Sequence, residues 1–194
     1  FLNGGKQADF LSGGSGNDTV VGAMHDDTLC GDGGLDSLEG GDGDDSLAGG
    51  PDADTLLGGI GDDFISGGQG GDLLFGGAGE DTLVGGLGAD QLFGGEGADH
   101  FLFRHSLDGV SGIDILADLE PGVDVVNLSA SIFTALAGSL GQKVGPGAHL
   151  VYDQASGVLA YDADGAASSA PIAFTVVGNA THPGVLGNDF LVVA

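Results

Sequence analysis

Large apolar residues recur at every ninth position over the first hundred residues, and glycine is the commonest residue between them. From Gly4 to Leu102 the chain divides into eleven nine-residue units without an insertion. Each unit has glycine at its first position, aspartate at its sixth and a large apolar residue at its eighth. Because strand side chains alternate between faces, the eighth residue is predicted to point inward and the seventh and ninth outward. Each unit therefore predicts a turn of six residues and a strand of three.

Stacking these units predicts a thin parallel β-solenoid. One unit cannot bury its single apolar side chain, whereas a stack of units forms a continuous core. Two units make one coil of strand, turn, strand and turn, so odd units form one parallel sheet and even units form the other. The predicted fold is all-β: a right-handed parallel β-roll of eleven nonapeptide repeats over residues 1–102, followed by a β-rich C-terminal capping domain over residues 103–194.

The charge of the chain adds a condition to this fold. The sequence holds 42 glycines and 29 acidic residues against three basic ones, Lys6, Arg104 and Lys143, for a net charge of −26. Such a composition is typical of disorder, yet 41% of the residues are hydrophobic and they are evenly spaced. We therefore expect folding to require neutralisation of the acid by cations. The scarcity of lysine and arginine argues against nucleic acid as a partner.

The unit consensus, G-G-x-G-x-D-x-U-x with U apolar, resembles the RTX (repeats-in-toxin, or hemolysin-type) repeat, a parallel β-helix that binds Ca²⁺. The resemblance implies that each Ca²⁺ lies between the turns of units n and n+2. The first turn supplies the carbonyls of positions 2 and 4 and its aspartate, and the second supplies the carbonyls of positions 1 and 3 and its aspartate. This all-oxygen set suits Ca²⁺, and eleven units allow up to about nine ions.

Carried onto this sequence, the resemblance assigns metal ligands in five pairs of turns, together with the repeat aspartates Asp27 and Asp54. The pairs are Gly14, Gly16 and Asp18 with Gly31, Gly33 and Asp36; Gly41, Gly43 and Asp45 with Gly58, Ile60 and Asp63; Gly59, Gly61 and Asp63 with Gly76, Ala78 and Asp81; Gly68, Gly70 and Asp72 with Gly85, Leu87 and Asp90; and Gly77, Gly79 and Asp81 with Gly94, Glu96 and Asp99.

The early units depart from the consensus at positions that require glycine. Position 2 is Ala23 in unit 3 and Asp32 in unit 4, and position 4 is Gln7, His25 and Asp52 in units 1, 3 and 6. The carbonyl oxygens survive these changes, but we expect strain because non-glycine residues rarely adopt positive φ.

The polar residues allow two alternative explanations. The repeat aspartates could cap turns without a metal, but stacked carboxylates without counter-charges repel one another. The five histidines are scattered, so they do not predict a zinc site, which needs clustered ligands. Adjacent acids at position 5, namely Asp26, Asp44 and Asp62, are expected to be solvated turn residues.

An outward-facing apolar strip is predicted on the sheet formed by even units. Leu57, Phe75 and Phe93 all occupy position 9 and are spaced by one coil, with Leu73 nearby. Exposed apolar strips of this kind indicate a partner. We expect the chain after residue 103 to fold back over this sheet, or an upstream domain to cover it.

The nine-residue frame ends near residue 103. Strands or turns are predicted at 113–119 and 124–129, a short helix at 132–140, a hairpin from 150–152 and 158–161, and strands at 172–177 and 190–193. The characteristic residues of this part are Phe101 to Phe103, Asp114 and Asp118, Asp124 to Ser129, Leu150 to Asp153, Gly157 to Gly165, and an acidic residue before a hydrophobic end, Asp189 to Ala194. Through these residues, the segment resembles the C-terminal domain of serralysin-type metalloproteases and related type I secretion substrates. Asn127 stands where that family usually has aspartate.

The function that the sequence predicts is a calcium-binding, secreted and non-catalytic module. The sequence has no H-E-x-x-H zinc-protease motif and no G-x-S-x-G lipase motif. No apolar run approaches the ~18 residues of a membrane span. The resemblance implies folding on Ca²⁺ outside the cell, interaction of the C-terminus with type I secretion machinery, and an upstream catalytic or toxin domain. The alternative is a Ca²⁺-dependent polysaccharide- or surface-binding accessory module, like the R-module of an epimerase.

Overall fold

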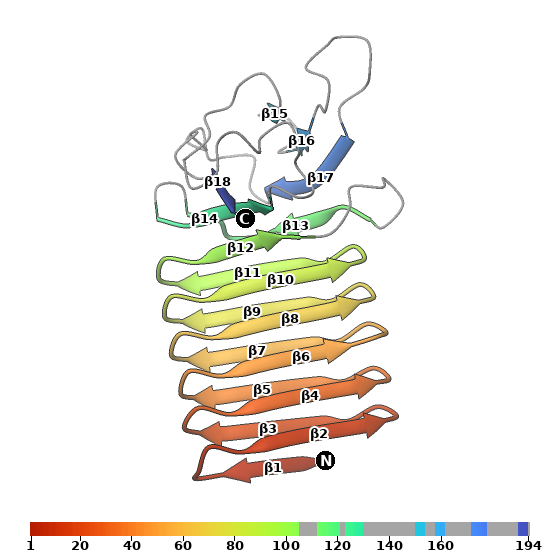
Figure 1. The fold of residues 1–194 in the computed structure, drawn as a ribbon, viewed down its shortest axis with the longest axis vertical. Coiled ribbons are helices and arrows are strands. Elements are labelled where there is room, and N and C mark those ends of the chain that lie inside the picture. Colours follow the sequence, from red (N-terminus) through yellow and green to blue (C-terminus); the bar gives the residue numbers. More distant parts are fainter. Residues whose placement is uncertain are drawn as a thin grey trace.

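The chain forms two parallel sheets that face each other across a narrow core (Figure 1). The structure, a computed structural model, describes residues 1–104, 112–120 and 123–129, and beyond these the backbone of 150–153, 158–161, 172–177 and 190–193. Successive strands along the chain belong to alternate sheets, so each sheet contains every second strand of the array. This confirms the predicted parallel β-roll and its division into odd and even units.

Among the described residues, sheet A holds ten strands and sheet B holds eight. In sheet A the spatial order is β1 (Leu2–Gly5), β3 (Thr19–Met24), β5 (Ser37–Asp42), β7 (Thr55–Ile60), β9 (Leu73–Ala78), β11 (Gln91–Glu96), β13 (Asp114–Leu116), β17 (Ile172–Val177), β16 (Val158–Tyr161) and β15 (Leu150–Asp153). In sheet B it is β18 (Phe190–Val193), β14 (Val125–Ser129), β12 (His100–Phe103), β10 (Thr82–Leu87), β8 (Phe64–Gln69), β6 (Ser46–Gly50), β4 (Thr28–Gly33) and β2 (Phe10–Ser15).

Most strands of the array contain six residues rather than the three that the sequence predicts. Each of these six-residue strands starts at position 7 of one unit and continues through the first three positions of the next. In β7 and β9, for example, Leu56 pairs with Leu74 and Gly59 pairs with Gly77. The prediction was too short because glycine has low strand propensity, whereas stacking of identical coils gives these glycines partners in the parallel ladder.

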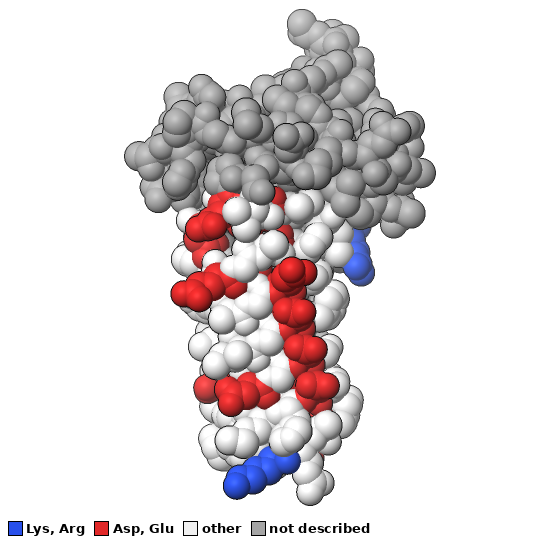
Figure 2. All heavy atoms as spheres, turned by 90° about the vertical axis from the view of Figure 1, so that its left-hand side faces the viewer, with Lys and Arg blue, Asp and Glu red and all other residues white. Residues whose placement is uncertain are grey.

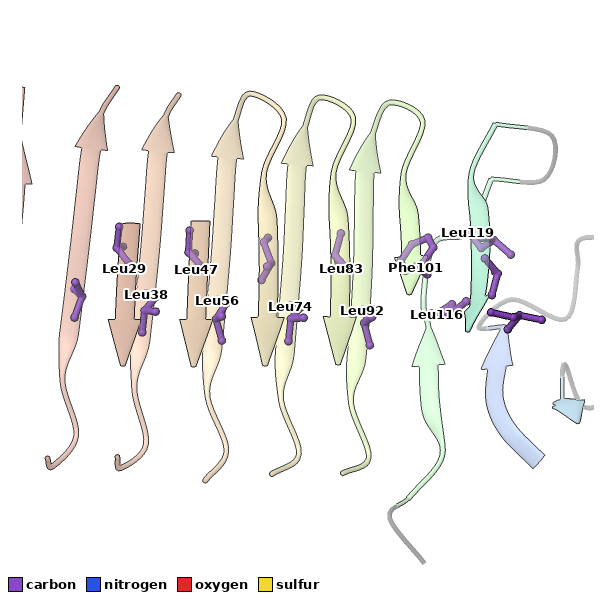
Figure 3. Packing of buried hydrophobic residues seen from close by; sticks show 14 residues of the cluster. Leu29, Leu38, Leu47, Leu56, Leu74, Leu83, Leu92, Phe101, Leu116 and Leu119 are labelled. Atoms are coloured by element: carbon purple, nitrogen blue, oxygen red, sulfur yellow. The ribbon is translucent and has the colours of Figure 1, made fainter. Parts of the chain in front are cut away.

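The core contains one inward side chain per repeat strand, as predicted from position 8. Leu29, Leu56, Leu74 and Phe101 have no exposed surface, and the same holds for most of this column (Figure 3). Leu2 and Leu11, in the first coil, and Phe103, at the end of the array, pack against the column while remaining partly exposed. The core is therefore continuous along the roll but only two side-chain layers wide.

Both sheets continue beyond the last nonapeptide. Strand β13 pairs in parallel with β11 in sheet A, and β14 pairs in parallel with β12 in sheet B. Strands β17 and β18 extend the same two sheets in turn. Strands β15 and β16 form the predicted antiparallel hairpin, and β16 pairs antiparallel with β17. The helix predicted at 132–140 falls outside the described residues.

The outer apolar strip of Leu57, Phe75 and Phe93 forms as predicted. Leu57 pairs in register with Phe75, and Phe75 pairs with Phe93. The two phenylalanine rings are stacked with their centroids 4.7 Å apart. The prediction that the chain folds back over this strip is wrong for the described part beyond residue 103, where β13 and β14 extend the sheets end-on and Leu57 stays 38% exposed. A strand that is added to the edge of a sheet pairs with the free backbone groups of that edge. A segment that lay over the face of the sheet would leave those groups unpaired.

The core column gives a direct stability test. Leu74→Ala removes a fully buried side chain and should lower the free energy of unfolding by about 2–5 kcal/mol. The matched control, Leu57→Ala in the neighbouring strand, removes the same atoms from the outer surface and should change it by no more than about 0.5 kcal/mol. Urea unfolding in excess Ca²⁺ measures both. Equal losses for the two variants would show that the column is not the core.

Candidate metal centre

The repeat aspartates form a ladder that runs from coil to coil along both turn edges. The backbone N–H of Asp63 donates to Oδ1 of Asp81 at 2.8 Å, one coil further along. The same bond, 2.7–3.0 Å long, joins Asp9 to Asp27, Asp18 to Asp36, Asp27 to Asp45, Asp36 to Asp54, Asp45 to Asp63, Asp54 to Asp72, Asp72 to Asp90 and Asp81 to Asp99. One oxygen of each carboxylate is thereby fixed.

In nine of the repeat aspartates, the second carboxylate oxygen is buried and lacks a hydrogen-bond donor. This holds for Oδ2 of Asp9, Asp27, Asp36, Asp45, Asp54, Asp63, Asp72, Asp81 and Asp99. A buried carboxylate oxygen without a donor or cation carries a large desolvation cost, and native proteins rarely leave such atoms unsatisfied. A row of them at the same place in successive turns indicates a missing positive ligand.

Backbone carbonyl oxygens converge on the same gaps between turns. A Cβ atom built on Gly77, at position 2, would overlap the carbonyl oxygen of Gly59, and one on Gly79, at position 4, would overlap that of Gly61. The carbonyls of positions 2 and 4 in one turn therefore point toward the turn one coil further along. Glycine is required there because any side chain would fill the space that these oxygens face.

The turn on the other side of each gap contributes the carbonyl oxygen of its position 1. A Cβ built on Gly58 would overlap Oδ2 of Asp63, in the same unit, and lie 2.6 Å from the carbonyl oxygen of Gly76, one coil further along. The unpartnered carboxylate oxygen and this carbonyl oxygen are therefore neighbours. The position 3 carbonyl of Ala78 also faces this gap, where it accepts the N–H of Gly61 at 2.9 Å.

The predicted strain is present in units 3, 4 and 6, but the prediction is wrong for Gln7 in unit 1, which does not have a positive φ. Ala23, His25, Asp32 and Asp52 are the non-glycine residues with positive φ, at 92°, 75°, 70° and 79°, among the described residues. They occupy the same positions 2 and 4 at which later units have glycine. The turn conformation is thus retained without glycine, at a cost of roughly 1–2 kcal/mol per residue.

The donor set fits a hard cation bound by few carboxylates. Within the described ranges, no three His, Cys, Asp or Glu side chains come together as a metal cluster. Each gap instead offers carbonyl oxygens with one carboxylate from each turn. This set lacks the nitrogen and sulfur ligands that zinc prefers and agrees with the oxygen-only preference of Ca²⁺. The residues present therefore fit calcium.

Electrostatics in the gaps favour a cation strongly. Burial, with the negative charge of neighbouring acidic residues and against the lowering effect of a backbone N–H donor, raises the pKa of Asp63 and of Asp72 to about 7. The same causes raise the pKa of Asp54, Asp81 and Asp99 to about 6. Without a cation, these carboxylates hold their protons to a higher pH than an exposed aspartate does.

A second row of acids lies on the outside of one turn edge, the edge formed by odd units (Figure 2). At position 5, the N–H of Asp44 donates to Asp26, that of Asp62 to Asp44, and that of Glu80 to Asp62, at 2.8–3.1 Å. These side chains are exposed, as predicted, and cap turns from outside. They raise the negative potential of this edge, but their oxygens face solvent.

Three aspartates beyond the nonapeptides join the ladder, and the repeat frame did not identify them as ligands. Asp114 Oδ1 accepts the N–H of Asp90 at 3.1 Å, and Asp124 Oδ1 accepts the N–H of Asp99 at 3.1 Å. Asp118 binds the N–H groups of Gly94 and Gly95. The bonds within the array join residues that are 18 positions apart, whereas these three aspartates lie 23–25 residues from their partners. Periodicity therefore did not identify them.

The profile of one protein family matches the array. It is described as the RTX calcium-binding nonapeptide repeat, and four copies match residues 3–38, 31–65, 39–74 and 66–101. Together these copies cover residues 3–101, about half of the chain. No curated protein matches the sequence.

Two solved structures are similar to parts of the chain. The first is the AlgE6R3 subunit of the mannuronan C5-epimerase from Azotobacter vinelandii, with 28% identity and a TM-score of 0.51 over 74% of this chain and 80% of that one. The second is the extracellular lipase LipA from Serratia marcescens, with 17% identity and a TM-score of 0.39 over 91% of this chain. The chain spans 38% of the length of that lipase.

The raised pKa values predict how the metal-free roll responds to pH. A folded pKa of about 7 for Asp63 and Asp72 lies above the unfolded value, so the folded state holds more protons than the unfolded state. This contribution to stability is complete below about pH 4 and is lost as the pH rises through about 7. In calcium-free buffer, the far-UV β signal should therefore grow between about pH 8 and about pH 5.

Protons should also compete with calcium for the same oxygens. The midpoint of a Ca²⁺ titration followed by circular dichroism should move to higher Ca²⁺ as the pH falls across this window. Asp63→Asn removes one of the responsible groups and should weaken the dependence. A midpoint that is unchanged, or that moves to lower Ca²⁺ in acid, would contradict the assignment.

Proposed function

The chain belongs to the RTX calcium-binding nonapeptide repeat family, and on that premise we propose that it is a calcium-dependent folding module of a secreted protein. The observation that carries the proposal is the row of buried Oδ2 atoms without donors in successive turns. A divalent cation in each gap supplies the missing charge and uses carbonyl oxygens from both adjoining turns.

The ligands in this proposal are those expected from the family pattern. Between units 7 and 9 they are the carbonyls of Gly59 and Gly61 with the carboxylate of Asp63, opposite Gly76, Ala78 and Asp81. The orientation of the position 1, 2 and 4 oxygens supports this set. The same arrangement extends to the other paired turns along the array, for up to about nine ions.

Calcium binding and folding are one process in this proposal. The unfolded chain has no preformed gap between turns, so the free energy of metal binding becomes free energy of folding. At low Ca²⁺ the net charge of −26 opposes compaction. The chain would stay open inside a cell that keeps Ca²⁺ low and would fold outside it, where Ca²⁺ is plentiful.

The proposed role in secretion follows from this switch. Residues 103–194 would act as a capping domain for the roll of residues 1–102, and the C-terminus would engage type I secretion machinery. The module itself would be non-catalytic and extracellular, and an upstream catalytic or toxin domain would supply any activity. The part of the chain that the structure describes contains no helix long and apolar enough to cross a membrane.

The proposal is tested with two adjacent aspartates of one turn. Asp63→Asn keeps the Oδ1 acceptor of the ladder but removes the buried charge that faces the gap. Asp62→Asn makes the same change on an exposed side chain. We expect Asp63→Asn to raise the Ca²⁺ concentration at the folding midpoint several-fold and Asp62→Asn to leave it nearly unchanged, as followed by circular dichroism and calorimetry.

Two outcomes would contradict the proposed function. One is equal behaviour of the two variants. The other is a chain whose β signal at neutral pH is as strong in chelator as in Ca²⁺. Titration with Mg²⁺ separates calcium binding from simple charge screening, because Mg²⁺ demands stricter octahedral geometry and gives up its water reluctantly.

A second candidate function is calcium-dependent binding of an anionic polysaccharide. It is favoured by the likeness to a repeat subunit of a mannuronan C5-epimerase. With only three basic residues in the chain, the acidic polymer would have to be bridged by Ca²⁺ rather than bound by lysine and arginine.

Calorimetric titration of the folded chain with mannuronan tests this candidate. If Ca²⁺ bridges the two, heat of binding should appear at Ca²⁺ concentrations above those that saturate folding, and a neutral glucan should give none. Absence of binding to mannuronan under these conditions would eliminate the candidate while leaving the folding role intact.

A further inference from the structure

The turn edge formed by even units continues past the eleven nonapeptides. After an interruption at residues 103–108, residues 109–117 read Gly-Val-Ser-Gly-Ile-Asp-Ile-Leu-Ala. This segment has glycine at positions 1 and 4, aspartate at position 6 and leucine at position 8 of the same nine-residue pattern. The matched family repeats end at residue 101, so neither the uninterrupted frame nor the family profile includes it.

The backbone of this segment takes the place of a repeat strand. Leu116 pairs in register with Leu92 and is fully buried in the core column (Figure 3). The N–H of Ile115 donates to the carbonyl oxygen of Asp90 at 2.8 Å, as the N–H of Gln91 donates to Asp72 one coil earlier, also at 2.8 Å. Positions 7 and 8 of a twelfth unit are therefore occupied as in the array.

The turn before this strand also repeats the geometry of the array. Gly112 has a φ of +99°, and a Cβ on it would overlap the carbonyl oxygen of Gly88. Gly88 stands in the same relation to the carbonyl oxygen of Gly70, one coil earlier. The position 4 carbonyl of unit 10 thus points into the gap below Gly112, as position 4 carbonyls do between the glycine turns of this edge.

Asp114 completes the pattern at position 6. It is 9% exposed, and its Oδ1 accepts the N–H of Asp90, which is the contact that every repeat aspartate makes with its predecessor. On the opposite turn edge, Asp124 makes the same contact with the N–H of Asp99 and a second one with the N–H of Glu120.

We propose that Asp114 forms a further calcium site with Asp90 and the carbonyl oxygen of Gly88, outside the eleven consecutive repeats. The inference rests on the proposed function, because it assumes that Ca²⁺ occupies the gap between turns one coil apart. It adds a member to the row of sites on the even-unit edge and links the repeat array to the strands that follow it.

Native mass spectrometry of the full chain in saturating Ca²⁺ tests the site by counting ions. Asp114→Asn keeps the Oδ1 acceptor of the Asp90 N–H and removes the charge, and it should hold one ion fewer than the unmodified chain. Asp62→Asn, an exposed carboxylate, is the matched control and should lose none. Asp72→Asn, in the array, reports on the proposed function itself and should also lose binding.

The three variants separate the two proposals. If Asp72→Asn loses an ion and Asp114→Asn matches Asp62→Asn, the further site is wrong and the proposed function stands. If neither Asp72→Asn nor Asp114→Asn loses an ion, both proposals fall.

Anomalous diffraction from crystals of the unmodified chain grown in Ca²⁺ covers the case in which Asp114→Asn does not fold. A calcium peak within about 2.3–2.6 Å of the Asp114 carboxylate and the Gly88 carbonyl oxygen supports the site. Calcium peaks in the array without one there would overturn it.

Discussion

A carboxylate that is buried between two turns of the same chain, without a donor for its second oxygen, is the constraint on which the rest of this structure depends. The coils are one strand spacing apart, so the repeat aspartates of neighbouring coils cannot separate without breaking the ladder that joins them. Nor can they turn outward, because Oδ1 holds the N–H of the preceding aspartate. Their charge must be removed in place, by protons or by cations, and the carbonyl oxygens around them favour a cation.

The apolar core explains why this constraint decides folding rather than merely modulating it. Each repeat strand contributes a single side chain to the column, so a coil gains far less hydrophobic stabilisation than a strand pair of a conventional sandwich. Ordering eighteen residues per coil, many of them glycine, costs a large conformational entropy. The glycines cannot be replaced to reduce that cost, since a Cβ at Gly77 or Gly79 would occupy the space that the carbonyl oxygens of the preceding coil face.

Periodicity sufficed to predict the roll, its two sheets and the buried column, because each depends on one residue type at a fixed interval. It underestimated strand length, since glycine propensity says nothing about a ladder that forms only when identical coils stack, as at Gly59 and Gly77. It placed the aspartates on the turns but could not show that Oδ1 and Oδ2 have different environments, which depends on rotamer and register. It also stopped at Leu102, because the interruption at residues 103–108 hides Asp114 and Leu116 from any strict nine-residue frame.

The two ends of the roll differ in a way that follows from the same backbone requirement. Positions 2 and 4 have positive φ in units 2 to 11, and Ala23, His25, Asp32 and Asp52 adopt it with strain, whereas from unit 7 onward glycine adopts it freely. In a solenoid each coil is stabilised chiefly by its neighbours. Strained coils therefore gain most from an unstrained coil that is already folded beside them.

The later coils border the strands that continue both sheets beyond Phe103. There Asp118 binds the N–H groups of Gly94 and Gly95, which lack a following repeat. The least strained turns thus adjoin the end at which backbone groups are satisfied by other means. The strained turns all lie among the first six units, the half of the array that begins with the partly exposed Leu2 and Leu11. Cation binding must therefore contribute most to the order of the early coils, although their turns provide it with the less favourable backbone.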